Sequence, residues 1–267
     1  MQLFNKLGFT WNRSAVPAGQ STSVERAVFR YKQSLAEFVY DAGALEGNPF
    51  TYPEVQTLLE GVTVGGRKLA DQQQIQNLGE AAKRLFSMVH DQEFRMDKPT
   101  SDEIHRLVGT REVFDPGYFR GEGDPLNLTV WPSVYLGKDE RYWPLPTEKG
   151  APELNRVFSE GITALSSEVS DPRERGMAYF LFGALQQLYF DGNKRTARFM
   201  MNGILMSHGV DAISVPAARL QDFNEKMVRF YTDKDATEMM HFLIECQPKN
   251  APKSRPAPSS GSRKGIL

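Results

Sequence analysis

The chain has 267 residues, with 32 basic and 33 acidic side chains, a net charge of -1 and a single cysteine. A charge this close to zero creates no general field that favours nucleic acid or an anionic membrane surface, and one cysteine excludes an internal disulfide and a multi-cysteine metal site. The first residues lack the apolar region of a signal peptide, and no apolar run is long enough to span a bilayer. We therefore expect a soluble, cytoplasmic protein whose partners include neither nucleic acid nor a membrane.

The first half of the chain predicts four helices after an irregular stretch over residues 1–20. Three of them begin with a threonine followed three residues later by a glutamate, the pattern of a capping box. The fourth shows apolar residues at helical spacing along one face. The helices are expected at 22–40, 51–61, 69–91 and 100–107, with the capping pairs Thr22 and Glu25, Thr51 and Glu54, and Thr100 and Glu103.

The middle of the chain, residues 113–150, is rich in Gly, Pro, Trp and Tyr and poor in helix formers. Short strands are predicted at 126–130 and 141–143, around a turn at 137–139. This composition favours a small β-hairpin or an extended loop.

Helices resume after residue 151. The pattern Asp171-Pro172-Arg173-Glu174 predicts a cap for one of them, because Asp accepts from free backbone N–H groups and Pro is tolerated in the first turn. The remaining residues, 247–267, are mostly Pro, Ser, Gly, Lys and Arg, which predicts a disordered basic tail. Helices are expected at 152–165, from Asp171 to the turn near residue 190, and at 193–207, 216–231 and 235–246.

The most informative stretch runs from Tyr189 to Arg198 and lies between two apolar runs, a layout that predicts helix, sharp turn, helix. The free N–H groups at the start of the second helix attract anions. Asp191 supplies the carboxylate oxygens that a divalent cation prefers, and Arg195 and Arg198 share one helix face, from which they can clamp phosphate oxygens. The pattern indicates a site for a metal-bound polyphosphate; the alternative is an ordinary Asp-Gly turn beside solvated cations.

Three motifs point to a family. Asp191-Gly192-Asn193-x-Arg195-x-x-Arg198 resembles the core of the Fic (Fido) signature, H-x-F-x-D-G-N-G-R-x-x-R. The segment from Ala44 to Asn48 resembles the Fic inhibitory segment, S/T-x-x-x-E-G/N, and the segment 117–120 resembles the lead into the Fic flap. Three motifs in the expected order are more specific than any one alone. The resemblance covers roughly residues 22–246.

The resemblance implies a mainly α fold, a Fic-type helical bundle with a small β-hairpin flap. It divides the chain into an N-terminal segment with an inhibitory-type helix (1–60), a Fic-like domain (61–246) and the basic tail (247–267). It implies an enzyme that binds ATP and Mg²⁺ and transfers AMP to a hydroxyl of a target protein, which the flap aligns by strand addition. A bacterial source and a homo-oligomer are further expectations.

The resemblance also assigns roles to the residues of the turn. Asp191 would hold Mg²⁺ between the phosphates, and the backbone of Gly192, Asn193 and Lys194 would cradle them. Arg195 would contact the phosphates and Arg198 the terminal one. In the segment formed by Glu46, Gly47 and Asn48, the carboxylate of Glu46 would compete for Arg198 and exclude the terminal phosphate, so that the protein inhibits itself.

The chain departs from the Fic pattern at three positions. Gln187 replaces the histidine that acts as general base, and losing such a base costs about 10²- to 10⁴-fold in rate. Lys194 replaces a glycine, as in the phage toxin Doc, a relative that phosphorylates its target. Ala42 replaces the Ser or Thr that helps to anchor the inhibitory segment. None of the four histidines takes the motif position, and His105 is expected to have a surface or core role.

Three functions therefore remain open from the sequence. The chain is a slow Fic-type AMP transferase, a pseudoenzyme that kept the phosphate site and lost the base, or a Doc-like kinase. Lys194 favours the kinase, and Gln187 disfavours it.

Overall fold

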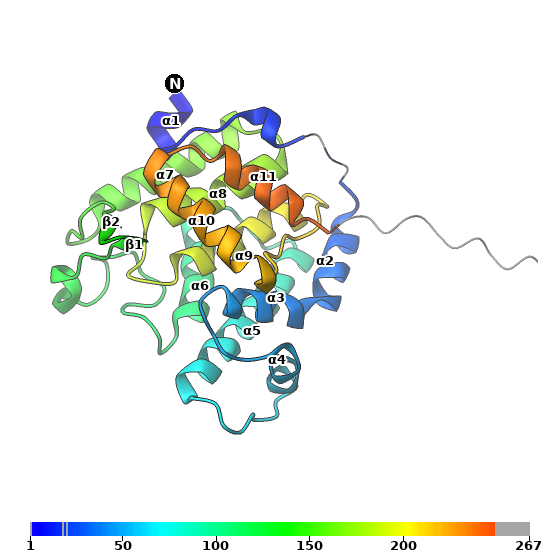
Figure 1. Ribbon diagram of the computed structural model, residues 1–267. Coiled ribbons are helices and arrows are strands. Elements are labelled where there is room, and N and C mark those ends of the chain that lie inside the picture. Colours follow the sequence, from blue (N-terminus) through cyan, green and yellow to red (C-terminus); the bar gives the residue numbers. More distant parts are fainter. Residues whose placement is uncertain (1, 18, 20, 249–267) are drawn as a thin grey trace, which may run out of the picture.

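The structure is a computed structural model that describes residues 2–17, 19 and 21–248. In this part of the chain it contains eleven α-helices and one two-stranded antiparallel sheet (Figure 1). The expected fold class, mainly α with a small hairpin, is confirmed. The α-helices are α1 (Gln2–Leu7), α2 (Val24–Gln33), α3 (Leu35–Ala44), α4 (Tyr52–Leu59), α5 (Leu69–His90), α6 (Lys98–Gly109), α7 (Pro152–Glu168), α8 (Pro172–Gln186), α9 (Asn193–Met206), α10 (Leu220–Asp233) and α11 (Thr237–Glu245). The strands are β1 (Val134–Gly137) and β2 (Glu140–Tyr142), and short 3-10 helices occupy Arg13–Ala15, Pro125–Thr129 and Ala217–Arg219.

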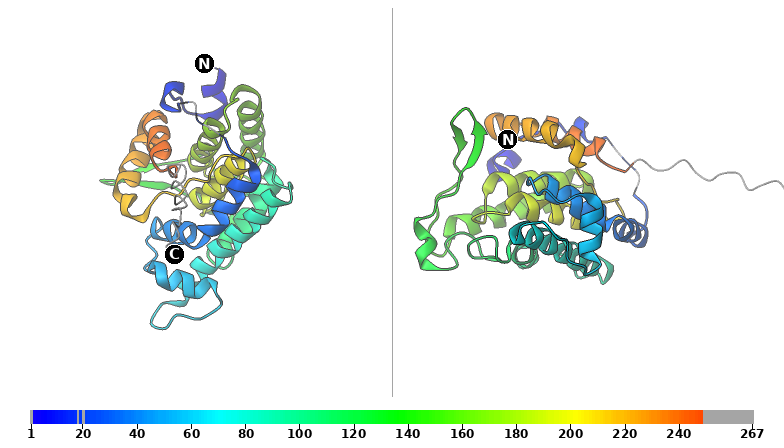
Figure 2. Two further views of the ribbon diagram at one scale, coloured as in Figure 1. Left: turned by 90° about the vertical axis from the view of Figure 1, so that its right-hand side faces the viewer. Right: turned by 60° about the horizontal axis from the view of Figure 1, so that its bottom comes forward.

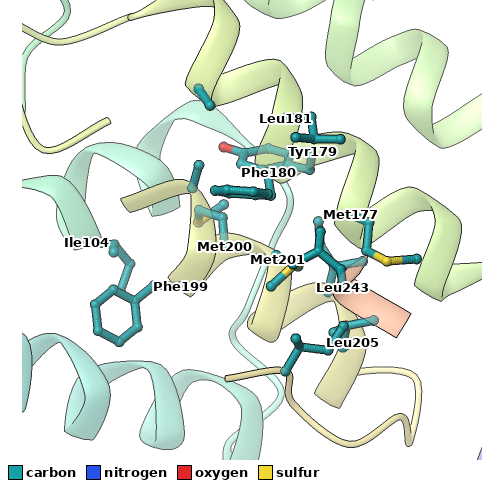
Figure 3. Packing of buried hydrophobic residues seen from close by; sticks show 14 of the residues in the cluster. Ile104, Met177, Tyr179, Phe180, Leu181, Phe199, Met200, Met201, Leu205 and Leu243 are labelled. Carbon is teal, nitrogen blue, oxygen red and sulfur yellow. The ribbon is translucent and has the colours of Figure 1, made fainter. Parts of the chain in front are cut away.

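Helices α8 and α9 form the centre of the molecule, where the apolar run of α8 packs against the apolar second half of α9. Almost every residue of both helices is buried, and side chains such as Phe180 and Met201 interleave between them (Figure 3). Gly183 lets the two backbones approach closely, since a Cβ at this position would lie 2.9 Å from the Cβ of Ala197. The turn between these two helices is therefore held by the best-packed part of the fold.

The other helices surround this central pair (Figures 1 and 2). Helices α5 and α6 pack on α9, α7 and α11 pack on α8, and α3 covers α5. Residues 2–17 were expected to be irregular, and this expectation is wrong for the first turn and a half, where α1 packs on α7. Beyond α1 the backbone of Thr10 pairs with Lys234 and Ala236, which ties the start of the described chain to its last helices.

The predicted helix starts have mixed outcomes. The capping box at the start of α4 is present, with the Thr51 N–H donating to Glu54 Oε2 at 2.7 Å. The predicted helix at 22–40 is wrong in two respects, since Ser23 rather than Thr22 caps α2 and the helix breaks at Ser34. The cap of α6 is Asp97, whose carboxylate accepts from the N–H of Thr100, so the helix begins earlier than predicted.

The hairpin is present, but its first strand was misplaced. Residues 126–130 alternate in polarity like a strand, yet Asp124 accepts from the Leu126 N–H and starts a 3-10 helix there. The strand lies further along, and Val134 pairs with Tyr142. The turn itself was predicted correctly, and its two central residues, Lys138 and Asp139, both have positive φ, the backbone that two-residue hairpin turns require.

The division into segments 1–60 and 61–246 remains a prediction. One continuous core of buried apolar residues runs through both, from Leu7 to Leu243. The predicted tail lies outside the described residues, apart from Gln247 and Pro248. Among the helices that the structure describes, none combines the length and the apolar character that crossing a membrane requires.

Candidate functional site

The site is built on the turn between α8 and α9. Gln187 follows the last residue of α8 and takes a left-handed conformation with φ of 47°, and Gly192, with φ of 73°, precedes the first residue of α9. Glycine suits this position, because its positive φ would strain any other residue, and a Cβ there would contact the ring of His105 at 3.4 Å. The first backbone N–H groups of α9 have no partner within the helix and provide donors for an anion.

The side chain of Asn193 fixes the shape of the turn. Its Oδ1 accepts from the Tyr189 N–H at 2.9 Å, and its Nδ2 donates to the Tyr189 carbonyl at 2.8 Å and to Gln187 Oε1 at 3.2 Å. One buried amide thus joins the end of α8, the loop and the start of α9. The structure gives Asn193 a positioning role at the turn.

His105 supports the turn from α6 and is not available as a base. Its Nδ1 accepts from the Gly117 N–H at 2.9 Å, so Nε2 carries the proton and donates to the Asp191 carbonyl at 2.9 Å. The ring stacks on Tyr189 with centroids 3.7 Å apart. Burial lowers the pKa of His105 to about 4, which keeps the imidazole neutral near pH 7. The expected core role is what the structure shows.

A cavity of about 270 Å³ lies between the turn and the hairpin. Strand β1 forms the wall opposite the turn. The lining residues are Glu46, Ser133, Val134, Tyr135, Gln187, Asp191, Gly192, Asn193, Lys194 and Arg195. The structure therefore brings seven of the residues selected from the sequence to one cavity, whereas Gly47, Asn48 and Arg198 do not line it.

Arg198 reaches the cavity indirectly, through its contact with Glu46. Its Nη2 lies 3.1 Å from Glu46 Oε1, and both side chains are largely buried. Burial lowers the pKa of Arg198. Burial alone would raise the pKa of Glu46, but the charges of Lys194, Arg198 and Arg195 hold it below its ordinary value. Glu46 is therefore ionised at neutral pH and lies among three cations.

Arg195 is paired with a second carboxylate, which the sequence did not reveal. Its Nη1 donates to Glu112 Oε2 at 2.8 Å, and its Nη2 lies 3.7 Å from Asp191 Oδ2. Glu112 follows α6 and is 83 residues away in sequence. It belongs to none of the three motifs, and only the packing of α6 and α5 against α9 brings it to the site.

Asp191 presents the carboxylate that suits a divalent cation. Its Oδ1 accepts from the Gly192 N–H at 2.6 Å, and its side chain is 74 % exposed at the cavity. The described residues contain no group of three or more His, Cys, Asp and Glu side chains arranged for a metal. A site with one protein carboxylate fits Mg²⁺ better than a dedicated metal cage does, since Mg²⁺ commonly binds through one carboxylate, substrate phosphates and water.

Gln187 and Ala42 show what the departures from the signature do to the site. The Gln187 Nε2 donates to the Ala184 carbonyl at 2.7 Å and its Oε1 accepts from Asn193, so a neutral amide is fixed at the cavity wall. Ala42 borders a cavity of about 30 Å³ next to Arg198. In the described part of the chain, Arg198 Nε is buried without a hydrogen-bond partner.

No family model matches the chain. Among curated proteins it is similar to "Protein adenylyltransferase Fic" of Nematostella vectensis, with 25% identity over 234 residues, which are 87% of this chain and 50% of that relative. It is also similar to "Protein adenylyltransferase fic-1" of Caenorhabditis elegans, with 26% identity over 202 residues, 73% of this chain and 36% of the relative. The chain thus spans half or less of the length of these two relatives.

Two solved structures share the arrangement of helices. Fic-1 (residues 134–508) from Caenorhabditis elegans superposes with a TM-score of 0.66 at 18% identity, covering 91% of this chain and 67% of that one. A Fic domain-containing signaling protein from Bacteroides thetaiotaomicron superposes with a TM-score of 0.66 at 17% identity, covering 92% and 91%. This chain has a Fic domain. The Fic turn, the hairpin beside it and the segment with Glu46 lie on the three sides of one cavity.

Proposed function

We propose that this Fic protein binds ATP with Mg²⁺ in the cavity between the turn and the hairpin. We propose further that Glu46 holds the site closed and that transfer of AMP to a protein hydroxyl is slowed by Gln187. The names of the relatives, protein adenylyltransferases, support the reaction class. The contact between Glu46 and Arg198 is the observation that carries the proposal.

The contact matters because one cation cannot serve two anions at the same atoms. Glu46 occupies Arg198 Nη2 at the edge of the cavity, and a terminal phosphate would need the same donor. Because Arg198 Nε already lacks a partner, an anion that displaces Glu46 would meet a buried and partly unsatisfied guanidinium. Inhibition would then be a direct competition between the carboxylate and the phosphate.

Other groups at the turn would bind the phosphates together with Arg198: backbone N–H groups, a second guanidinium and a bound cation. The backbone N–H groups of Asn193 and Lys194 donate to phosphate oxygens at the start of α9, and Arg195 adds a guanidinium on the same side. Asp191 would hold Mg²⁺ with the phosphates. The cation would neutralise charge that develops on the phosphate oxygens during transfer.

The chemical step needs a group that removes the proton from the target hydroxyl. The Gln187 amide lies at the motif position and has no basic pair of electrons at neutral pH, while His105 is buried with both ring nitrogens occupied. Transfer would therefore run about 10²- to 10⁴-fold below an enzyme that has the base. The target would enter along β1 and pair with its outer edge, which pairs with no third strand in the part of the chain that the structure describes.

A second candidate function is a nucleotide-binding regulator that performs no transfer. The observation that favours it is the fixed amide of Gln187, which is hydrogen-bonded at both ends and stabilises the turn without taking part in proton transfer.

Lys194 leaves open a third outcome. The phosphates could bind in a shifted pose, and a phosphate could be transferred in place of AMP, as in Doc.

The test is to restore the base in an open site. In the Glu46→Gly background, we expect Gln187→His to raise labelling of a protein hydroxyl from labelled ATP by about 10²-fold or more. The mass of the adduct distinguishes AMP from phosphate. Gln186→His is the matched control, because the Gln186 side chain donates away from the cavity to the Leu7 carbonyl. If labelling stays at the level of this control, the site does not support transfer and the regulator is favoured.

A further inference from the structure

The two carboxylates that hold the arginines of α9 differ in their surroundings. Glu46 lines the cavity, and Arg198 is its hydrogen-bond partner among the described residues. Glu112 lies outside the cavity lining, and both of its oxygens are occupied. Its Oε1 accepts from Asn77 Nδ2 at 2.7 Å, and its Oε2 accepts from Gln74 Nε2 at 3.1 Å as well as from Arg195. Glu46 is placed to compete with a ligand, whereas Glu112 is placed to hold Arg195.

The amides that hold Glu112 continue to the inhibitory-type segment. Gln74 Oε1 accepts from Asn48 Nδ2 at 3.0 Å, while Gln74 Nε2 donates to Glu112. Asn48, 9% exposed, also donates to the Asp71 carbonyl at 2.9 Å and accepts from the Phe50 N–H at 3.1 Å. These backbone partners fix which end of the Asn48 amide donates. Because Glu112 can only accept while ionised, the direction of the Gln74 amide is fixed as well.

The chain of contacts therefore runs from Asn48 through Gln74 and Glu112 to Arg195. Asn48 follows α3, Gln74 lies on α5, Glu112 follows α6 and Arg195 lies on α9. Helix α5 packs on α3, α6 and α9 (Figure 1). Glu46, two residues before Asn48, contacts Arg198 directly. One short segment thus reaches both arginines of the turn, one by a salt bridge and the other through two intervening side chains.

We propose that Glu112 is a positioning residue that presets Arg195 for phosphate, and that Gln74 links it to Asn48, so that the segment 46–48 controls both arginines. The proposal rests on the proposed function, because it assigns Arg195 to phosphate. The single bond from Arg195 Nη1 to Glu112 leaves Nη2 directed to the side of Asp191, where the phosphates would lie. Without Glu112, the guanidinium would have to be ordered when the ligand binds.

The first test uses the protein without nucleotide, so it does not depend on ATP binding. The rotation rate of the Arg195 guanidinium is measured by NMR, with its signal assigned from Arg195→Lys. We expect Glu112→Gln to raise this rate at least tenfold and Gln74→Met to raise it at least threefold. Glu103→Gln, which removes from α6 the carboxylate that pairs with Arg84, serves as the control and leaves the rate unchanged. An unchanged rate in Glu112→Gln overturns the positioning role, and an unchanged rate in Gln74→Met overturns the link to Asn48.

The second test measures the dissociation constant of MgATP in the Glu46→Gly background, where the competitor is absent. We expect Glu112→Gln to raise this constant about tenfold, the effect of losing one charge-assisted hydrogen bond that orders the ligand-binding group. The Glu103→Gln control keeps the constant of the parent. If the Glu46→Gly parent binds MgATP and adding Glu112→Gln leaves the dissociation constant unchanged, the positioning role alone is contradicted. A parent that does not bind MgATP contradicts the proposed function, and the guanidinium rates then decide the present proposal.

Discussion

Arg195 and Arg198 lie one turn apart on α9, and each is buried against a carboxylate from a distant part of the chain. Two buried cations side by side are unfavourable unless they are paired, because desolvation penalises each charge and the charges repel. Removal of one carboxylate leaves a buried charge without a partner. The same physics that makes Glu46 a stabilising neighbour therefore makes the site attractive to a phosphate once Glu46 has moved away.

His105 makes stability depend on pH at this site. In the folded protein its pKa is about 4, below its ordinary value of 6.5, because burial opposes the charged form. The unfolded chain therefore binds a proton between these values and the folded protein does not. The contribution is fully present above pH 6.5 and is lost as the pH falls toward 4. We expect His105 to reduce the free energy of unfolding by up to about 3 kcal/mol over this window.

Urea unfolding at several pH values checks this expectation. His105→Gln should flatten the dependence between pH 4 and pH 6.5, whatever its effect on absolute stability. His90→Gln, with an exposed ring, should retain the slope of the wild type. An equal slope in His105→Gln would mean that other groups produce the dependence.

The residues of the turn could be predicted from the sequence because they lie together in the chain and match the spacing of a known motif. The roles predicted for Asp191, Arg195 and Glu46 remain proposals. The contributions of Glu112, Gln74 and Asn77 could not be predicted, because one glutamate and two amides far apart in the chain form no recognisable motif. Their relation to the site exists only where α5 and α6 pack on α9.

At the scale of elements, Arg120 joins the segment before the hairpin to the turn. It is completely buried, its Nε donates to the Gln187 carbonyl at 2.6 Å, and its Nη1 and Nη2 donate to Thr147 and Leu145 after the hairpin. Burial lowers its pKa to about 10, so it is still a cation at neutral pH. Its three partners are neutral oxygens, and through them Arg120 links the turn to the segment that follows the hairpin.

We expect Arg120→Met to lower the free energy of unfolding by about 3 kcal/mol, because it removes the donor from the buried Gln187 carbonyl and from the partly buried Leu145 carbonyl and Thr147 hydroxyl. Hydrogen exchange should rise in residues 134–142 at the same time. Arg141→Met, which removes an exposed arginine from the hairpin itself, should change neither quantity appreciably. Unaltered stability and exchange in Arg120→Met would show that the hydrogen bonds of Arg120 are not needed to hold the hairpin against the turn.

The elements that sequence patterns predicted well are those with long apolar repeats or strong caps, such as α5 and α4. The errors come from places where a local capping or helix-ending residue overrides the pattern of apolar residues. Asp124 and Pro125 start a 3-10 helix inside a stretch that alternates like a strand, and Ser34 ends a helix whose apolar repeat continues beyond it. A short helix such as α1 has too few residues for a repeat, and its packing on α7 stabilises it.

At the scale of the whole molecule, the buried core extends across the predicted boundary at residue 60. Val28, Tyr31 and Val39 belong to the same cluster as Leu78 and the residues of α8 and α9. Without residues 1–60, one face of α5 and part of α9 would be exposed to water. The cost of that exposure is roughly 25 cal/mol for each Å² of apolar surface.

We therefore expect a fragment of residues 61–267 to melt at least about 10 °C below the intact chain, or to lose its cooperative transition. Circular dichroism during heating measures this. Addition of a separate 1–60 segment should restore the transition. A fragment that melts like the intact chain would support the division into an independent domain that the sequence predicted.

The central claim is that Glu46 and a phosphate compete for Arg198, and calorimetry of MgATP binding tests it most directly. The account predicts a dissociation constant at least about tenfold lower in Glu46→Gly than in the wild type, since the competing carboxylate is gone. It also predicts that Arg198→Ala in the same background abolishes the gain. Equal affinity in wild type and Glu46→Gly, or binding that survives Arg198→Ala, would contradict the account.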